Sequence, residues 1–407
     1  MTSRPDQTSP DVVRLRPCPY PYRAVLAICS DLDETPDAHV YFETARYLNT
    51  AEDTCMGPGL GLEVGNTIYF DMPPSQFAYW NTDERGREGL RALMRSGHID
   101  CFHSFGDLAV TRRDAARSLD DLDHHGCRLA VWIDHAVAPT NFGADIMRGS
   151  GDLPGAPAYH ADLTVGHGVR FVWRGRVTSV TGQDVPRRLG GIFDPRHALA
   201  SSRTLAKEAA KGALGALGVE KYAMHRPNRV QRGVELRDGQ PVFEFLRANP
   251  FWQAVDEGET ADGLAGVLTE GLLDRLAGRG GLTVLYTHLG KVGDPKVPFG
   301  PRTRAALGRL AEAYRAGRVL VTTTRRLLEY ARDREEAKWE CRRRDGALEI
   351  DVRTPGTGAG LCFLLPSPEP ARVTVNGRPI AAKPVPAGLA GGGCVCLPWP
   401  RLEFPRL

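Results

Sequence analysis

Two carboxylates separated by a single leucine follow an apolar run near the start of the chain. The run "AVLAICSDLDE" has the composition of a buried strand and leads directly into Asp31 and Asp33. Side chains two residues apart in a strand point to the same face, so the two acids project together if the extended backbone continues to Asp33. Two like charges at such a distance repel each other unless one is protonated or a cation lies between them. The pair therefore indicates a cation at the end of this strand.

An imidazole and another carboxylate follow the next apolar run. In "GHIDCFHSFGD", His103 and Asp107 are four residues apart and face the same way if a helical turn begins at His103. Together with Asp33 they form a set of one imidazole and two carboxylates, which suits a divalent metal ion and leaves coordination positions open. The alternative is that the acids only cap a turn and that His103 has a structural role.

Two further apolar runs end in groups that could take part in chemistry. One ends at Asp134 and His135, and the other ends at Thr287 and His288. In parallel α/β sheets the reactive groups gather beyond the carboxyl ends of the strands. If these strands are parallel neighbours of the first, all of these side chains lie along one rim of the sheet.

The elements that would position these groups follow a repeating pattern. Amphipathic segments such as 84–97 and 301–317 alternate with short apolar runs that are typical of buried strands. The predicted strands are residues 23–31, 97–104, 127–135, 169–175, 282–290 and 318–324. Such alternation predicts a largely parallel α/β sheet, either open or closed into a barrel. After residue 338, short strand signals separated by glycine and proline predict a small C-terminal all-β appendage.

Composition and charge exclude several classes of protein. Of the 407 residues, 42% are apolar and 25% are charged, with a net charge of +3, as in ordinary soluble globular proteins. Arginines are interleaved with acids, so no nucleic-acid partner is expected. The sequence lacks both a run of ~20 apolar residues and a signal-peptide core, so no membrane contact is expected. Nine scattered cysteines favour reduced thiols in a cytoplasmic protein. The sequence leaves open whether the protein forms a homo-oligomer.

Three of these segments together resemble a known family. "SDLDE", "GHIDCFHSFGD" and "VLYTHLG" are similar to the motifs of the polysaccharide deacetylase superfamily, which comprises carbohydrate esterase family 4 and its relatives. The resemblance extends over roughly residues 20–335 and implies a distorted, incomplete (β/α) barrel. Together with the polar, proline-rich start and the turn-rich end of the chain, it predicts an N-terminal arm (1–20), a polysaccharide-deacetylase-like barrel (21–338) and a small β domain (339–407).

The resemblance also implies a role for each residue of the motifs. Asp31 corresponds to the family's catalytic base, and His288 corresponds to its catalytic histidine, which acts as the acid. Asp33 and His103 correspond to metal ligands, and Asp107 stands where the family has a second metal-binding histidine. The expected cofactor is one zinc ion. Because a carboxylate makes the site harder, manganese, iron, cobalt or nickel are alternatives.

The implied activity is the hydrolysis of a C–N amide bond by water that the metal ion activates. The expected reaction is N-deacetylation of an acetylated amino sugar or a related small molecule in carbohydrate metabolism. The alternatives are a hydrolase of another amide, such as a cyclic amide or a ureide, and a catalytically silent carbohydrate-binding relative. The presence of both Asp31 and His288 favours an enzyme, because a binding protein needs neither.

The chain also departs from the family's pattern at its third motif. The expected Arg-Pro pair is not recognisable, and "VWIDHA" stands at the comparable place. The side chains expected to contact a small-molecule or saccharide substrate are Trp132, Asp134, His135, His160 and Arg247. Aromatic rings suit sugar faces and arginine suits carboxylates, although a packing role is equally open for these residues.

Overall fold

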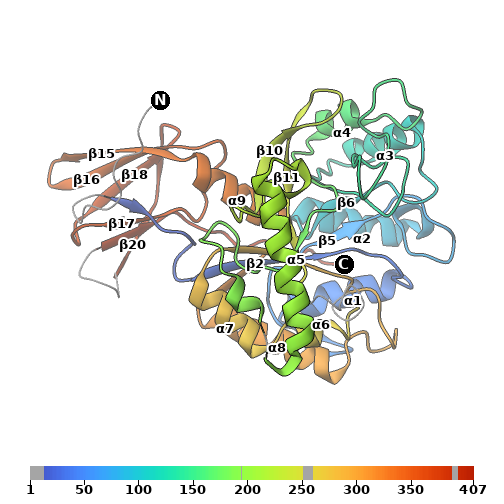
Figure 1. Ribbon diagram of the computed structural model, residues 1–407, viewed down its shortest axis with the longest axis horizontal. Helices are drawn as coiled ribbons and strands as arrows, with labels where there is room; N and C mark the ends of the chain where they lie inside the picture. Colours follow the sequence, from blue (N-terminus) through green and yellow to red (C-terminus); the bar gives the residue numbers. More distant parts are fainter. Residues whose placement is uncertain (1–12, 194, 251–259, 387–392) are drawn as a thin grey trace.

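The computed structural model describes residues 13–193, 195–250, 260–386 and 393–407 and shows a mixed α/β protein (Figure 1). One sheet has the strand order β14-β2-β13-β12-β9, and all of its neighbouring strands are parallel. Its strands are β2 (Ala24–Ser30), β9 (Val177–Thr178), β12 (Arg247–Ala248), β13 (Leu282–Thr287) and β14 (Val319–Thr322). The central strand, β2, is buried along its whole length, as its apolar sequence predicts.

A second sheet has the order β10-β11-β8-β7-β6-β5 and packs with β5 against β2 of the first. Its strands are β5 (Asn66–Ile68), β6 (Ile99–His103), β7 (Val131–Ile133), β8 (Phe171–Trp173), β10 (Gln231–Glu235) and β11 (Pro241–Phe245). Only β10 and β11 pair antiparallel. The predicted parallel α/β class is confirmed, and the carboxyl ends of β6, β7 and β8 point the same way.

Helices cover these sheets and connect their strands (Figure 1). The α-helices are α1 (Ala38–Asn49), α2 (Glu84–Ser96), α3 (Arg112–His124), α4 (Ala161–His167), α5 (Ala198–Ala216), α6 (Leu264–Val267), α7 (Glu270–Arg279), α8 (Pro301–Arg315) and α9 (Thr324–Glu336). The short 3-10 helices are η1 (Tyr79–Asn81), η2 (Leu189–Ile192), η3 (Pro195–His197) and η4 (Glu220–Tyr222).

Local sequence signals set the ends of α2. The Asp83 side chain accepts a hydrogen bond from Gly86 N at 2.7 Å and caps the amino end. Gly97 closes the carboxyl end with a φ of 83°, a left-handed conformation that glycine adopts without strain. Leu90 and Leu93 lie on the buried face between them, as the helical spacing predicts.

The chain after α9 forms strands in two four-stranded sheets, which lie together on one side of the molecule (Figure 1). The first has the order β15-β16-β18-β19 and the second the order β1-β17-β21-β20. The strands are β1 (Arg14–Leu15), β15 (Lys338–Arg344), β16 (Ala347–Arg353), β17 (Cys362–Leu365), β18 (Ala371–Val375), β19 (Arg378–Ile380), β20 (Lys383–Pro386) and β21 (Gly393–Cys396). A separate hairpin joins β3 (Asp53–Thr54) and β4 (Gly57–Pro58).

These C-terminal strands share an apolar core with the α/β part. One continuous buried cluster includes Val25 of β2, Leu327 of α9 and Ile350 of β16. The tail beyond β21 then returns to the α/β part, where the Phe404 ring packs on His98 with 5.0 Å between centroids. The β strands are therefore packed firmly against the sheets that carry the strand ends.

A buried carboxylate holds the returning tail. Glu63 is 3% exposed and accepts hydrogen bonds from Thr322 Oγ1, Arg326 Nη1 and Leu402 N. The Arg326 guanidinium also stacks on Trp399, 4.3 Å from the ring centroid. One acid thus ties the end of β14, the first turn of α9 and the tail together.

Replacing this acid should weaken the fold measurably. Glu63→Gln removes the charge and leaves the Arg326 guanidinium without its anionic partner, so we expect a loss of ~3 kcal/mol in the free energy of unfolding. Urea unfolding measures the loss. The control is Glu340→Gln, which breaks an exposed pair with Arg342 and should cost less than ~1 kcal/mol. Equal losses in the two variants would contradict the role given to Glu63.

A second buried carboxyl should make stability depend on pH. Asp100 of β6 accepts a hydrogen bond from Arg325 N at 2.6 Å, and burial raises its pKa to about 6. Because the folded state favours protonated Asp100, protonation of this carboxyl stabilises the fold. The stabilisation is complete below the pKa of Asp100 in the unfolded chain and is lost as the pH rises through 6. Asp100→Asn mimics the neutral form. The variant should therefore gain on the order of 3 kcal/mol over the wild type between pH 4 and pH 8.

Unfolding free energies measured at both pH values check this expectation. The exposed Asp120→Asn serves as the control and should give the same difference from wild type at both. A difference for Asp100→Asn that does not change with pH would refute it.

Candidate metal centre

β2 delivers two acids to the carboxyl edge of its sheet. The strand ends at Ser30, and Asp31 N still donates to Thr287 O of β13 at 2.9 Å, so the pairing continues to Asp31. The Asp31 side chain is buried, whereas that of Asp33 is 18% exposed. The chain turns immediately afterwards, where Glu34 has a φ of 57°. Both carboxylates therefore lie at the end of the strand.

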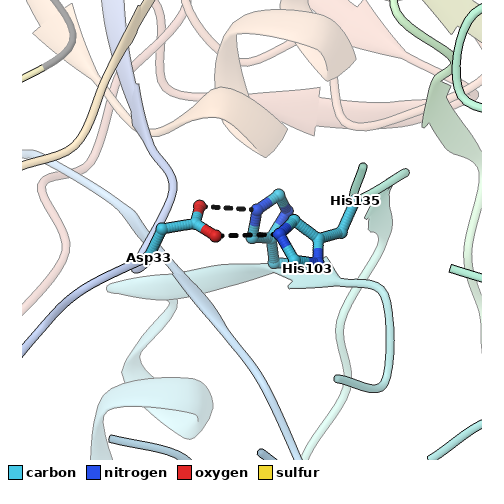
Figure 2. A group of neighbouring side chains, drawn as sticks. All are labelled: Asp33, His103 and His135. Atoms are coloured by element: carbon cyan, nitrogen blue, oxygen red, sulfur yellow. Dashed lines mark hydrogen bonds and ion pairs between the residues drawn. The ribbon is translucent and has the colours of Figure 1, made fainter. Parts of the chain in front are cut away.

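The two carboxylate oxygens of Asp33 each face one of two imidazoles, which lie at or just beyond the ends of neighbouring parallel strands. His103 is the last residue of β6 and pairs in register with Ile133, which His135 follows by two residues. His103 Nε2 is 3.1 Å from Asp33 Oδ2, and His135 Nε2 is 2.9 Å from Asp33 Oδ1 (Figure 2). These residues each place one ligand atom within 4.8 Å of the others. One carboxylate and two imidazoles at this spacing can coordinate a single ion.

A second group of ligand atoms shares Asp33. His288 directly follows β13, and its Nε2 lies 3.1 Å from Asp33 Oδ2. Asp31, Asp33 and His288 also place one ligand atom each within 4.8 Å of one another. The predicted meeting of strand ends is therefore confirmed for these five residues, although the strands that carry them belong to two sheets and not to one.

Asp107 occupies a different place from the one that the sequence predicts. Among the described residues it belongs to neither ligand group; its Oδ1 lies 3.2 Å from His135 Nδ1, and 44% of its side chain is exposed. The reason lies in the backbone. Ser104 has a φ of 50° and Gly106 a φ of 104°, so no helical turn begins at His103, and the next helix, α3, starts later. His135, expected to contact substrate, takes the third position of the group.

The contact between Asp107 and His135 is of a kind found around metal centres. A metal-ligating histidine usually directs its other ring nitrogen at a carboxylate or carbonyl, which fixes the tautomer and the orientation of the ring. The separation here is that of an ion pair, although its angles fall short of a hydrogen bond. His103 Nδ1 is likewise buried and forms no hydrogen bond within the described part of the chain. Asp107, which the sequence predicts as a ligand, thus lies next to the outer nitrogen of a candidate ligand, His135.

Arg247 forms a buried ion pair with Asp31. Its Nη1 lies 2.6 Å from Asp31 Oδ1, and its guanidinium stacks 3.5 Å from the ring centroid of Trp173 and 4.2 Å from that of Tyr286. Burial by itself would raise the pKa of Asp31, but the positive charge of Arg247 together with the neighbouring His103 and His288 outweighs it and holds that pKa below its usual value. The sequence predicts a substrate contact for Arg247, whereas the structure directs it at the predicted base.

The surroundings of Asp33 also favour its ionised form. Burial would raise the pKa of this carboxyl, but the neighbouring imidazoles outweigh burial and lower the pKa well below its usual range. Tyr69, which follows β5, donates its hydroxyl to Asp33 Oδ1 at 2.7 Å. Burial raises the pKa of this phenol, so it stays a donor. Sequence reasoning missed Tyr69 because β5 is only three residues long and gives a weak strand signal.

Three predicted substrate contacts lie in the protein interior. Trp132 is fully buried and donates to Asp134 Oδ1 at 2.8 Å. Asp134 is also fully buried, and burial raises its pKa to about 7. His160 Nδ1 lies 2.7 Å from Thr164 Oγ1, and its Nε2 lies 2.8 Å from Thr140 O. These polar atoms are engaged within the protein, so the side chains support the neighbouring loop rather than form a substrate surface.

No family model, curated protein or solved structure matches the chain. Within the described ranges, no helix combines the length and apolar character needed to cross a membrane. The chemistry of the chain must therefore be inferred from the geometry around Asp33.

Metal titration separates the roles of His135 and Asp107. His135→Ala removes a ligand atom, so we expect the affinity for Zn²⁺ to fall by more than ~100-fold. Asp107→Ala removes only the carboxylate that orients the ring and should cost about 10–100-fold. Competition with a coloured chelator measures both. The exposed Glu34→Ala also removes a negative charge nearby and should leave the affinity unchanged. If His135→Ala and Asp107→Ala reduced the Zn²⁺ affinity equally, Asp107 would have to be counted as a metal ligand.

Proposed function

We propose that the protein is a metal-dependent amidohydrolase that removes the acetyl group from an acetylated amino sugar or a related small molecule. The observation that carries the proposal is the arrangement around Asp33. Two imidazoles face its two oxygens, and a second carboxylate, Asp31, and a third imidazole, His288, lie beside it. This set contains ligands, a proton acceptor and a proton donor. The likeness of its motifs to the polysaccharide deacetylase superfamily supports the same reaction.

The residues fit a divalent ion. Three ligand atoms converge within 4.8 Å, and Asp107 faces the outer nitrogen of one imidazole, as is common for metal-bound histidine. One carboxylate and two imidazoles suit zinc first, while manganese, iron, cobalt and nickel also accept such ligands. When bound, the ion would polarise the amide carbonyl and acidify a water molecule enough for a weakly basic carboxylate to accept its proton.

Of the two overlapping groups, we assign the ion to Asp33, His103 and His135. Arg247 already compensates the charge of Asp31, so a nearby cation stabilises Asp31 less than it stabilises Asp33. The other group would use Asp31 and His288 as ligands and leave the site without its acid and base. The assignment therefore keeps both proton-transfer groups available.

Asp31 and His288 would then move protons on either side of amide cleavage. Arg247 binds Asp31 Oδ1 and keeps the carboxylate ionised, which leaves Oδ2 to accept a proton from the attacking water. His288 Nε2, which lies 3.4 Å from Tyr286 OH, would donate a proton to the departing amine nitrogen. Both side chains are at most 3% exposed, so bulk water has little access to them.

We further propose that the two parallel sheets form the distorted, incomplete (β/α) barrel of that superfamily, and that β15–β21 form a small β domain. The packing of β5 against β2 supports the barrel. The apolar core shared between Val25 and Ile350 indicates that the boundary near residue 338 joins two closely packed parts. All nine cysteines are free thiols, which suits a cytoplasmic enzyme acting on a small saccharide.

Asp31→Asn tests the division between ligand and base. The change preserves size and removes the proton acceptor, so we expect the release of acetate from N-acetylated amino sugars to fall about 10²–10⁴-fold. Zinc affinity should stay within about threefold of the wild type, because Asp31 is not a ligand in this assignment. Asp33→Asn is the comparison variant and should lose the ion itself. Loss of zinc in Asp31→Asn would favour the second ligand group, and a wild-type protein that releases no acetate would refute deacetylation.

A further inference from the structure

The loop that carries His135 is held in an unusual shape. β7 ends at Ile133, and three residues later the chain reverses through Ala136, which has a φ of 41°. This left-handed conformation is disfavoured for alanine, so the surrounding structure must hold it. Ala138 N donates to His135 O at 3.0 Å and closes the turn. His135 is therefore presented by a short turn and not by a strand.

One side chain binds both backbone polar groups of His135. Asn141 is fully buried, and its Oδ1 accepts a hydrogen bond from His135 N at 2.9 Å. Its Nδ2 donates to His135 O at 2.9 Å and to Ala136 O at 3.3 Å. The Asn141 backbone is itself fixed, because its N–H donates to Ala138 O and its carbonyl accepts from Gly151 N, each at 3.0 Å.

The returning end of the loop is bound by the residue that precedes His135. Asp134 is fully buried; its Oδ1 accepts from Phe142 N and its Oδ2 accepts from Gly143 N, both at 2.8 Å. Trp132 Nε1 also donates to Oδ1. Asn141, near the end of the 135–143 loop, thus binds its start, and Asp134, just before the loop, binds its end. The sequence spacing of His135 does not predict these hydrogen bonds.

We infer that Asn141 is the positioning residue for the metal ligand His135 and that Asp134 supports it; the inference rests on the proposed function. Coordination tolerates only small displacements of a ligand atom. His103 is fixed by the ladder of β6, whereas His135 lies beyond the end of β7 and needs another constraint. Asn141 supplies it by fixing the His135 backbone, while Asp107 orients the ring.

The test measures Zn²⁺ affinity by chelator competition, with Co²⁺ absorption as an independent readout of the ligand geometry. Asn141→Ala should weaken binding about 10–100-fold, the range typical of groups that orient a ligand. The matched control is Asn49→Ala. Asn49 is also buried and makes the same set of bonds, one accepted from Val64 N and two donated to Ala45 O and Val64 O, away from the ligand group. The Asn49→Ala variant should bind Zn²⁺ with the same affinity as the wild type.

A double-mutant cycle with His135→Ala shows whether Asn141 acts through His135. In the His135→Ala background, Asn141→Ala should change the affinity by less than about threefold, because the ligand that it positions is gone. If Asn141→Ala fails to fold, Asn141→Asp replaces it; this variant keeps the acceptor for His135 N, loses both donors, and should bind zinc with intermediate affinity.

The outcomes test the positioning role of Asn141 separately from the proposed metal centre. Equal affinity in the wild type and Asn141→Ala, or equal losses in both backgrounds of the cycle, would overturn the positioning role and leave the metal centre intact. A wild-type protein that binds neither Zn²⁺ nor Co²⁺ would overturn both.

Discussion

The arrangement of the whole site depends on the charge of one partly buried carboxylate, Asp33. Asp31 has a permanent partner in Arg247, but in the described part of the chain Asp33 forms ion pairs only with imidazoles. Neutral imidazoles donate hydrogen bonds and carry no compensating charge. A carboxylate at this depth is costly unless it is paired, so the arrangement favours either protonated imidazoles or a bound cation. The neighbouring histidines are arranged as ligands for such a cation.

The parallel sheets are what bring these groups together. Parallel strands of one sheet end at the same edge, and the packing of β5 against β2 joins the two sheets, so residues at the ends of β2, β6, β7 and β13 meet although they are far apart in sequence. His103 and Asp33 are separated by 70 residues and His288 and Asp33 by 255, yet their side chains lie 3.1 Å apart. Helices and the shared apolar core keep the strands in register, which gives distant residues a fixed geometry.

Rigidity at the rim comes from buried polar side chains rather than from the strands alone. Asn141 and Asp134 fix the loop after β7, and Arg247, whose guanidinium contacts two aromatic rings, holds Asp31. The polar atoms of Trp132, Asp134 and His160 also have their partners within the protein, which explains why these three predicted substrate contacts lie behind the site. A preorganised site needs such support because it cannot rely on ligand binding to order its loops.

The sequence by itself determined six of the strands (β2, β6, β7, β8, β13 and β14), the parallel α/β class and the meeting of Asp31, Asp33, His103 and His288 at the strand ends. These follow from local apolar periodicity and from the polar residues that end each run. Only the tertiary structure decided that Asp31 pairs with Arg247, 216 residues away, and that His135 stands where Asp107 was expected. Pairings across the sheet depend on strand order, and the path of residues 104–107 depends on backbone angles that residue type alone does not fix.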